Sequence, residues 1–343
     1  MMIRAIEVAR SRRLKDLAPV ARPTSGALLP GQVQLRMEAL ALNFRDLLVA
    51  TAKERWASPD ARILGSDGVG TVTALGPGAN RFRSGDRVLT TILPNWLDGP
   101  LSAEKSAGAL GGPAADGVFA EHVQLQESGL LRAPSYLSSL EAATLPVAAL
   151  TAWHALSRAQ ALRPTAKIVI EGAGGVSLFA LQIALAAGAE VIAVVRSDEK
   201  MSLLQRLGAS AVVDSRTTPD WGRRVWEMTG EGVDAVIDIG GASTLNQAIG
   251  AAAFGGTVAV VGVAGGLEAT TNLADIFRKN LRLEGIETGS QSMLKEMIGW
   301  LEQKRVHPII DRVFAFDDCA EAFQYLHKGN HFGKVTMALE VRG

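Results

Sequence analysis

The chain contains 343 residues, more than a single hydrophobic core usually supports, so two domains are expected. Its 35 Lys and Arg balance 35 Asp and Glu, and this zero net charge argues against nucleic acid or an anionic membrane as a partner. Cys319 is the single cysteine, which excludes a disulfide framework and any multi-cysteine zinc site.

No export or membrane signal is predicted. Residues 1–15 carry arginines but no apolar core of signal-peptide length. The apolar run at 178–187 is too short for a bilayer, which takes roughly twenty residues. A cytoplasmic enzyme with a small-molecule substrate is therefore expected.

Residues 1 to about 149 are expected to form mainly strands and turns. The segment 94–117 is rich in glycine and alanine and predicts a long loop, and loops of this length are usually functional. The predicted elements are strands at 2–8 and 31–41, a glycine-punctuated strand pair at 65–78, and a helix at 139–158 interrupted at Pro146.

From about residue 150 the pattern changes to strands that alternate with helices. The predicted strands are 167–171, 190–195, 211–213, 233–238, 257–263 and 281–287, and the helices are 176–187, 198–207, 220–229, 243–253 and 273–280. This alternation predicts a doubly wound parallel sheet. The chain is expected to end with helix 291–305, strand 309–314, helix 317–328 and strand 334–341.

A glycine loop follows the first strand of this sheet and precedes an apolar helix. It reads Gly172-Ala173-Gly174-Gly175-Val176-Ser177, in the strand–turn–helix order of a dinucleotide-binding unit. Gly172 permits the tight turn, and Gly174 lets a pyrophosphate approach the backbone, where free amides favour an anion. Gly175 and Val176 are expected to contact it too, and Ser177 replaces the usual third glycine.

The end of the second sheet strand favours NADPH over NADH. NAD enzymes usually place an acid here to hold the ribose 2′-hydroxyl, and Val195 occupies that place. Arg196, Ser197 and Lys200 follow it and are expected to bind a 2′-phosphate. The alternative is that these residues form an ordinary solvated surface.

The whole chain resembles the medium-chain dehydrogenases/reductases, in the zinc-free branch related to quinone oxidoreductases and zinc-type alcohol dehydrogenase-like proteins. The resemblance rests on motifs in the family's order: 43–46 (NFRD), 65–70 (GSDGVG), 82–88, 145–152 (LPVAALTA), the glycine loop and 331–335 (HFGKV). It implies an α/β fold in which a Rossmann domain, 150–286, is inserted into a GroES-like β-barrel catalytic domain, 1–149 and 287–343. It also implies a homodimer that pairs through strands 257–263 and 281–287.

The positions of the family's catalytic zinc ligands carry Asn43, Ser66 and Val147. None of them is a good zinc ligand, and the segment 94–117 has no cysteine for a structural zinc. A metal-free protein is therefore expected. Without a Lewis acid, a conjugated acceptor such as a quinone or enone is easier to reduce than an isolated ketone.

The resemblance also assigns site residues. Asn43, Arg45 and Asp46 are candidate catalytic residues, Arg45 as an oxygen-polarising group held by Asp46; the alternative is a structural Asp–Arg pair. Trp96 is a candidate substrate contact or a packed part of its loop. The remaining predicted cofactor contacts are Thr151, Gly240 with Gly241, Gly262, Val263, Thr288, Gly289 and Lys334, and each glycine could serve an ordinary turn.

The leading hypothesis is an NADPH-dependent oxidoreductase that acts without zinc on a small quinone, enone or carbonyl compound. One alternative is an alcohol dehydrogenase or ketone reductase of the same fold. Another is a regulatory protein that binds NADPH without turnover. A methyltransferase would want an acid where Val195 stands, which argues against that class.

Overall fold

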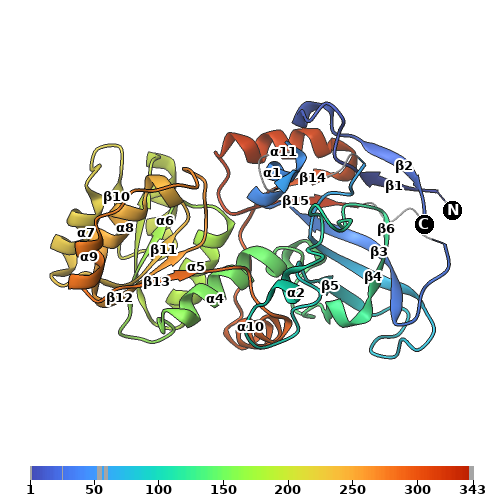
Figure 1. Ribbon diagram of the computed structural model, residues 1–343, viewed down its shortest axis with the longest axis horizontal. Helices are drawn as coiled ribbons and strands as arrows, with labels where there is room; N and C mark the ends of the chain where they lie inside the picture. The colour runs from blue at the N-terminus through green and yellow to red at the C-terminus, as the bar shows by residue number, and fades with distance from the viewer. Residues whose placement is uncertain (1, 25, 52–55, 58–60, 340–343) are drawn as a thin grey trace. The chain divides into compact units, whose positions relative to one another are not determined.

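The computed structural model describes residues 2–24, 26–51, 56–57 and 61–339 (Figure 1). The chain divides into two compact units, a catalytic unit of Met1–Leu150 with Gly289–Gly343 and an inserted unit of Thr151–Thr288. The boundaries predicted from the sequence lie one and two residues from these.

The inserted unit contains a six-stranded parallel sheet in the order β10-β9-β8-β11-β12-β13. This confirms the predicted doubly wound sheet. The strands are β8 (Lys167–Glu171), β9 (Glu190–Val195), β10 (Ala211–Asp214), β11 (Val233–Asp238), β12 (Ala252–Val260) and β13 (Arg282–Gly285). Because the order reverses beside β8, the loops after β8 and β11 lie next to each other at the carboxyl edge, where such sheets bind ligands.

Helices connect these strands at close to the predicted positions. They are α4 (Leu150–Arg158), α5 (Gly175–Ala186), α6 (Asp198–Arg206), α7 (Trp221–Thr229), α8 (Leu245–Ala251) and α9 (Leu273–Arg278), with a 3-10 turn at Gly241–Ser243. The apolar run of α5 is buried on most sides, as a helix packed against a sheet requires. Strand β12 begins five residues before its predicted start and ends three before its predicted end.

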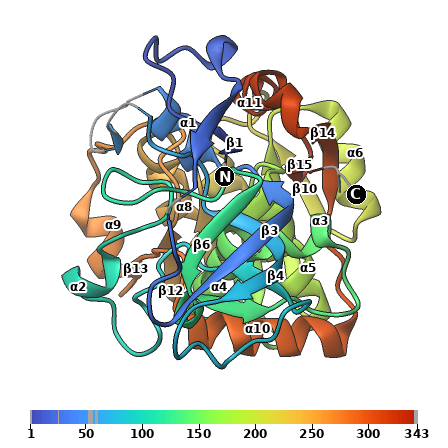
Figure 2. The same cartoon turned by 90° about the vertical axis from the view of Figure 1, so that its right-hand side faces the viewer.

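The catalytic unit is built on a seven-stranded sheet in the order β14-β15-β3-β4-β5-β7, with β6 paired to β3 (Figure 2). Among the described strands this path does not return to β14. Its strands are β3 (Gln32–Ala41), β4 (Asp67–Leu75), β5 (Arg87–Thr90), β6 (His122–Gln126), β7 (Leu130–Arg132), β14 (Ile310–Ala315) and β15 (Lys334–Ala338). Strand β3 alternates buried and partly exposed side chains, so one face of the sheet covers the core.

Further elements border this sheet. A separate antiparallel pair joins β1 (Met2–Ile6) to β2 (Pro19–Pro23), a strand that the sequence analysis did not predict because a proline stands at each end. The helices are η1 (Leu14–Asp16), α1 (Phe44–Ala50), α2 (Ala103–Ser106), η3 (Glu127–Gly129), α3 (Ser139–Ala142), α10 (Gln291–Lys304), η6 (Phe316–Asp318) and α11 (Cys319–Lys328).

The helix predicted over 139–158 is broken by a π-helical turn, Leu145–Ala149, between α3 and α4. Pro146 has no amide hydrogen to donate, which explains why regular α-helical bonding fails at this point. Leu150 N donates to the carbonyl of Leu145, the five-residue spacing of a π-turn.

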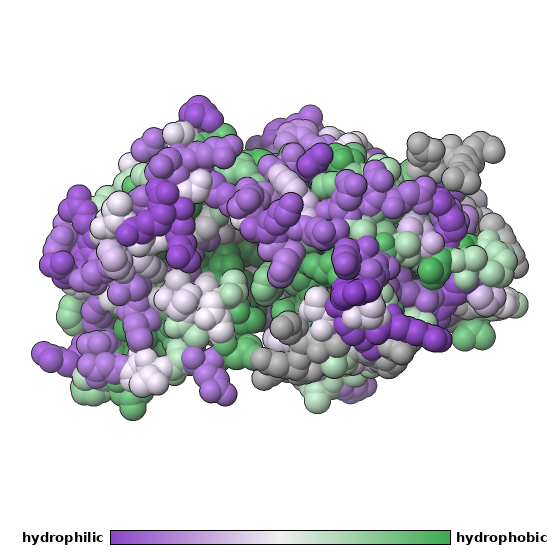
Figure 3. Space-filling view, turned by 90° about the horizontal axis from the view of Figure 1, so that it is seen from above, coloured by the Kyte–Doolittle hydropathy of each residue, from purple (hydrophilic) through white to green (hydrophobic). Residues whose placement is uncertain are grey.

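Hydrophilic side chains are spread over the visible face of both units rather than gathered in one region (Figure 3). This agrees with the balanced charge of the sequence. Among the helices of the described residues, none combines the length and hydropathy needed to cross a bilayer.

Candidate active site

The glycine loop of the inserted unit has the backbone geometry that its sequence predicts. Gly172 has a φ of +72°, and its amide donates to the carbonyl of Val194 on the neighbouring strand at 2.8 Å. Ser177 lies in the first turn of α5 and donates from Oγ to the carbonyl of Glu171 at 2.5 Å. The small serine therefore ties the helix to the end of β8, which explains how it can replace glycine here.

The N-terminus of α5 is suited to an anion. Its N-cap is Gly174, which supplies no side-chain hydrogen bond to the first turn, and Gly174, Gly175 and Val176 are partly exposed. The twelve-residue helix therefore presents backbone amides and the positive end of its dipole to solvent. This fits the pyrophosphate of a dinucleotide.

Charged side chains of both signs surround the end of β9. Arg196 is exposed, and Ser197 caps α6 by accepting from the amide of Lys200. Arg216, which the sequence analysis missed, bonds Asp214 at 2.7 Å and Asp198 at 2.5 Å, so the acid closest to Arg196 is already paired. An exposed guanidinium at this position fits a 2′-phosphate.

The loops after β11 and β12 pack so closely that glycine is required. A Cβ on Gly262 would lie 2.3 Å from the carbonyl oxygen of Ile239, and one on Gly241 would lie 2.8 Å from the carbonyl oxygen of Gly262. Gly240 and Val263 belong to the same contact. These predicted cofactor residues are therefore brought together beside the glycine loop.

Helix α4 fixes the last residues of the inserted unit. His154 Nδ1 lies 2.9 Å from the carbonyl oxygen of Glu287 and 3.2 Å from that of Thr288, so Nδ1 carries the proton in the neutral ring. Thr151 and Thr288 are both buried, and the Thr288 hydroxyl has no hydrogen-bond partner within the described residues. A buried hydroxyl without a partner fits a contact with a bound cofactor.

The catalytic unit contains a buried polar cluster of Asn43, Ser66, Asp67, Asp46 and Lys334. Lys334 Nζ donates to the Asn43 side-chain oxygen at 2.6 Å and to the Leu42 carbonyl at 2.7 Å. Ser66 Oγ donates to Asp67 at 2.9 Å, and the backbone amide of Asn43 donates to Asp46 at 2.8 Å. The predicted cofactor residue Lys334 is therefore part of the group that includes Asn43 and Asp46.

Burial dominates the electrostatics of this cluster. It raises the pKa of Asp46 to about 6, against the opposing charge of Arg45, and raises the pKa of Asp67, against that of Lys334. Burial also lowers the pKa of Lys334, whereas the two carboxylates oppose this shift. The positive charge of Lys334 thus opposes the burial of Asp67, and Lys334 and Arg45 together oppose that of Asp46.

Arg45 and Trp96 hold the segment 94–117. Arg45 Nη1 donates to the carbonyl of Leu110 at 2.9 Å. Trp96 is buried with Ile92 and Leu93, packs against Val147, and donates from Nε1 to the carbonyl of Gly99 at 2.7 Å. Val147, which packs against this apolar group, donates from its backbone amide to Asp67 of the polar cluster at 3.3 Å. Gly289, also in this unit, packs on Leu150, which a Cβ would contact at 2.8 Å.

The zinc-ligand positions do not fit a zinc ion. Asn43 and Ser66 offer no thiolate or imidazole, and Val147 offers no donor atom in its side chain. The Asn43 side-chain oxygen instead accepts from the Lys334 ammonium group. In the described part of the chain, no three His, Cys, Asp or Glu side chains gather as metal ligands.

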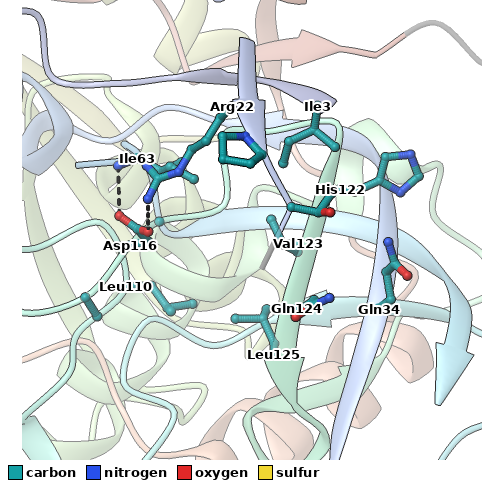
Figure 4. Close-up of a pocket in the computed structure, with 14 residues that line it drawn as sticks. Ile3, Arg22, Gln34, Ile63, Leu110, Asp116, His122, Val123, Gln124 and Leu125 are labelled. Atoms are coloured by element: carbon teal, nitrogen blue, oxygen red, sulfur yellow. Dashed lines mark hydrogen bonds and ion pairs between the residues drawn. The ribbon is translucent and has the colours of Figure 1, made fainter. Parts of the chain in front are cut away.

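A cavity of about 250 Å³ lies elsewhere in the catalytic unit (Figure 4). Ile63, Leu110 and Val123 are among its apolar walls, and the Arg22–Asp116 ion pair, 2.9 Å long, lies at one side. None of the predicted site residues lines it. Because the charges at its wall are already paired, we assign it no part in the site.

Comparison with known proteins identifies the family. The family described as zinc-binding dehydrogenase matches residues 175–303, and the alcohol dehydrogenase GroES-like domain matches residues 29–135. A zinc-type alcohol dehydrogenase-like protein of Schizosaccharomyces pombe is 37% identical over 332 residues, which cover 95% of this chain and 96% of that protein. The chain therefore belongs to the medium-chain dehydrogenase/reductase superfamily and is an oxidoreductase, as the sequence motifs predict.

Solved structures agree with this assignment. A putative alcohol dehydrogenase from Sinorhizobium meliloti has a TM-score of 0.90 and 36% identity, with 98% of each chain covered. A structure described as an NAD-dependent alcohol dehydrogenase has a TM-score of 0.87 and 33% identity, and covers 98% of this chain and 100% of its own. These similarities confirm the predicted Rossmann and GroES-like fold.

Proposed function

We propose that this protein is an NADPH-dependent reductase that transfers hydride to a small quinone or enone without zinc. The observation that supports this most is the buried cluster. Asn43, at one of the positions that correspond to the family's zinc ligands, accepts a hydrogen bond from the ammonium group of Lys334. Because the cluster contains no zinc ligand set, polarisation of the substrate oxygen falls to hydrogen-bond donors in a buried site.

The bound nicotinamide would supply the hydride. The residues of the inserted unit would hold the cofactor: the α5 amides the pyrophosphate, Arg196 and Ser197 the 2′-phosphate, and the Thr288 hydroxyl a group beside them. A conjugated acceptor spreads its developing charge onto a remote oxygen, so it needs less local polarisation than an isolated ketone. Asn43 and Arg45 remain the proposed substrate-facing groups, and Trp96 the proposed apolar contact.

The direct test is NADPH oxidation by the EDTA-treated protein with a panel of quinones, enones and isolated ketones, together with NADP⁺ reduction by the same protein with a panel of alcohols. We expect turnover of quinones or enones, unchanged by EDTA or added Zn²⁺. Turnover confined to alcohols and isolated ketones would favour the alcohol dehydrogenase alternative. NADPH binding, seen by quenching of tryptophan fluorescence, without oxidation by any acceptor would favour a regulatory protein.

Arg196→Ala is expected to weaken NADPH binding by about tenfold and to change NADH binding by less than about twofold. A hydrogen bond to a charged group contributes about 1.5–3 kcal/mol, and solvent exposure reduces that value. Dissociation constants for both cofactors, measured by fluorescence titration, check this. Arg206→Ala, an exposed arginine at the other end of α6, is the matched control. An equal loss for both cofactors would contradict NADPH selectivity, and would favour the NAD dependence named for the 33%-identical structure.

We also propose that a second copy of this chain docks on the β13 edge of the sheet. Strand β12, which pairs with β13, and helix α9, which precedes it, carry exposed apolar side chains: Phe254 is 71%, Leu273 69% and Phe277 70% exposed. Phe277→Asp is expected to shift a dimer to monomer in light scattering at micromolar concentration. Leu29→Asp, an exposed apolar position of the catalytic unit, should leave the mass unchanged. A wild-type monomer would contradict this proposal.

A further inference from the structure

Two buried acids face each other at the carboxyl edge of the inserted sheet. Glu171 is the last residue of β8, immediately before the glycine loop, and Asp238 is the last residue of β11, immediately before the 239–241 turn. These strands are direct neighbours in the sheet. Glu171 is 7% exposed and Asp238 is fully buried.

One oxygen of each carboxyl group has ordinary partners. Glu171 Oε2 accepts from the amides of Ile239 and Gly240 at 3.3 and 3.2 Å. Asp238 Oδ1 accepts from the Gly241 amide at 3.0 Å and the Thr244 hydroxyl at 2.6 Å. Both acids therefore hold the backbone of the same turn.

The other two oxygens are buried without a donor. Glu171 Oε1 and Asp238 Oδ2 have no hydrogen-bond partner within the described residues. The two carboxyl groups stand at the ends of paired strands and hold the same turn, which brings them side by side. Two ionised carboxylates cannot bond to each other, but a single proton between them gives each orphaned oxygen a partner.

We propose that Glu171 and Asp238 share one proton, and that this proton fixes the 239–241 turn against the glycine loop in the geometry that binds the nucleotide. Glu171 is thus a positioning residue for the cofactor. This inference rests on the proposed cofactor function. Loss of the proton would place a second negative charge beneath a site that binds phosphates, and would leave two buried charges in mutual repulsion.

The charges around Glu171 agree with a shared proton. Burial, followed by the charge of Asp238, raises the pKa of Glu171 to about 8. The largest effects that oppose this shift come from the Gly240 amide and the Thr244 hydroxyl. The proton is therefore held at neutral pH and is lost in mildly alkaline solution.

The test compares wild-type protein with Glu171→Gln, whose amide can donate to Asp238 while its oxygen accepts from the turn. The wild-type dissociation constant for NADPH should rise above pH 8 by up to about tenfold per pH unit, because only the protonated fraction binds. The Glu171→Gln variant should match wild type at pH 7 and stay constant to pH 9.5. Asp238→Asn should remove the pH dependence in the same way.

A second readout needs no cofactor. Between about pH 4.5 and pH 8 the folded state keeps the proton that the unfolded state has lost, so the wild-type unfolding midpoint should fall as pH rises. Glu171→Gln should lose this slope above pH 6, and the exposed control Glu190→Gln should keep it.

The outcomes separate the two proposals. NADPH binding that does not change above pH 8, or that changes equally in Glu171→Gln, overturns the shared proton and leaves the proposed function standing. Failure of the wild-type protein to bind NADPH at any pH overturns the proposed function and the positioning role together. In that case, if the pH dependence of the unfolding midpoint is lost in Glu171→Gln, the shared proton itself is still supported.

Discussion

Lys334→Met is expected to lower the free energy of unfolding by about 3–5 kcal/mol at pH 7, because it leaves buried carboxylates without a nearby counter-charge. The positive charge of Lys334 opposes the effect of burial on Asp67 and, together with Arg45, on Asp46, and both acids are fully buried. Methionine keeps most of the side-chain volume, so the loss reports charge and hydrogen bonding rather than a cavity. Urea unfolding followed by tryptophan fluorescence measures it.

Two controls make this result specific. Lys328→Met, an exposed lysine at the end of α11, should change stability by less than about 0.5 kcal/mol. Adding Asp67→Asn to Lys334→Met should recover part of the loss, because the second substitution removes a carboxylate left without its counter-charge.

The Lys334→Met variant should also become relatively more stable as pH falls from 7 to 5, since protonation neutralises the two acids. A loss that is independent of pH and not relieved by Asp67→Asn would contradict charge compensation.

Gly262→Ala is expected to cost about 1–3 kcal/mol of stability and at least about tenfold in NADPH affinity. The new Cβ would lie 2.3 Å from the carbonyl oxygen of Ile239, so the backbone must move either in the loop after β12, which contains Gly262, or in the loop after β11, which contains Ile239. The loop after β11 contains the 239–241 turn, which lies beside the glycine loop at the carboxyl edge of the sheet. Thermal unfolding and fluorescence titration with NADPH measure the two effects.

Gly285→Ala is the matched control. Gly285 ends β13 in the same unit, has no positive φ, and a Cβ there would meet no atom within 4 Å. We expect an unchanged NADPH affinity and a stability change below about 0.5 kcal/mol. Equal effects of the two substitutions would show that the close contact of Gly262 with Ile239 does not cause the loss of stability and of NADPH affinity.

Local patterns predicted the inserted unit well. The apolar runs of β8 and β9 are bounded by glycine and polar residues, and each forms a strand with the predicted ends. Gly172 could be assigned to a tight turn from the sequence alone, because a backbone with positive φ favours glycine whatever the surrounding structure. The doubly wound parallel arrangement could be inferred because alternating strands and helices leave few topologies open.

The electrostatics of the site were beyond prediction from local patterns. Lys334 and Asn43 are 291 residues apart in sequence, so nothing near either residue indicates that one bonds to the other. Glu171 and Asp238 likewise meet only because β8 and β11 become neighbours. The sequence did contain one indication of this pair: each acid ends an otherwise apolar strand. A buried acid is costly in free energy and therefore needs a partner. Strand β12 was misplaced because two glycines, 255 and 256, interrupt its pattern.

The π-helical turn at Leu145–Ala149 has a consequence for how insertions and deletions are tolerated. A π-turn accommodates one residue more than an α-helical turn, and each residue of an α-helix advances the side-chain direction by about 100°. Because the π-turn takes up its extra residue locally, removing one residue here would restore α-helical bonding and leave the side chains of α4 facing their present neighbours. It would shift the Val147 amide, which now donates to Asp67 instead of serving the helix. The extra residue of this turn is therefore what makes a backbone donor available to a buried acid.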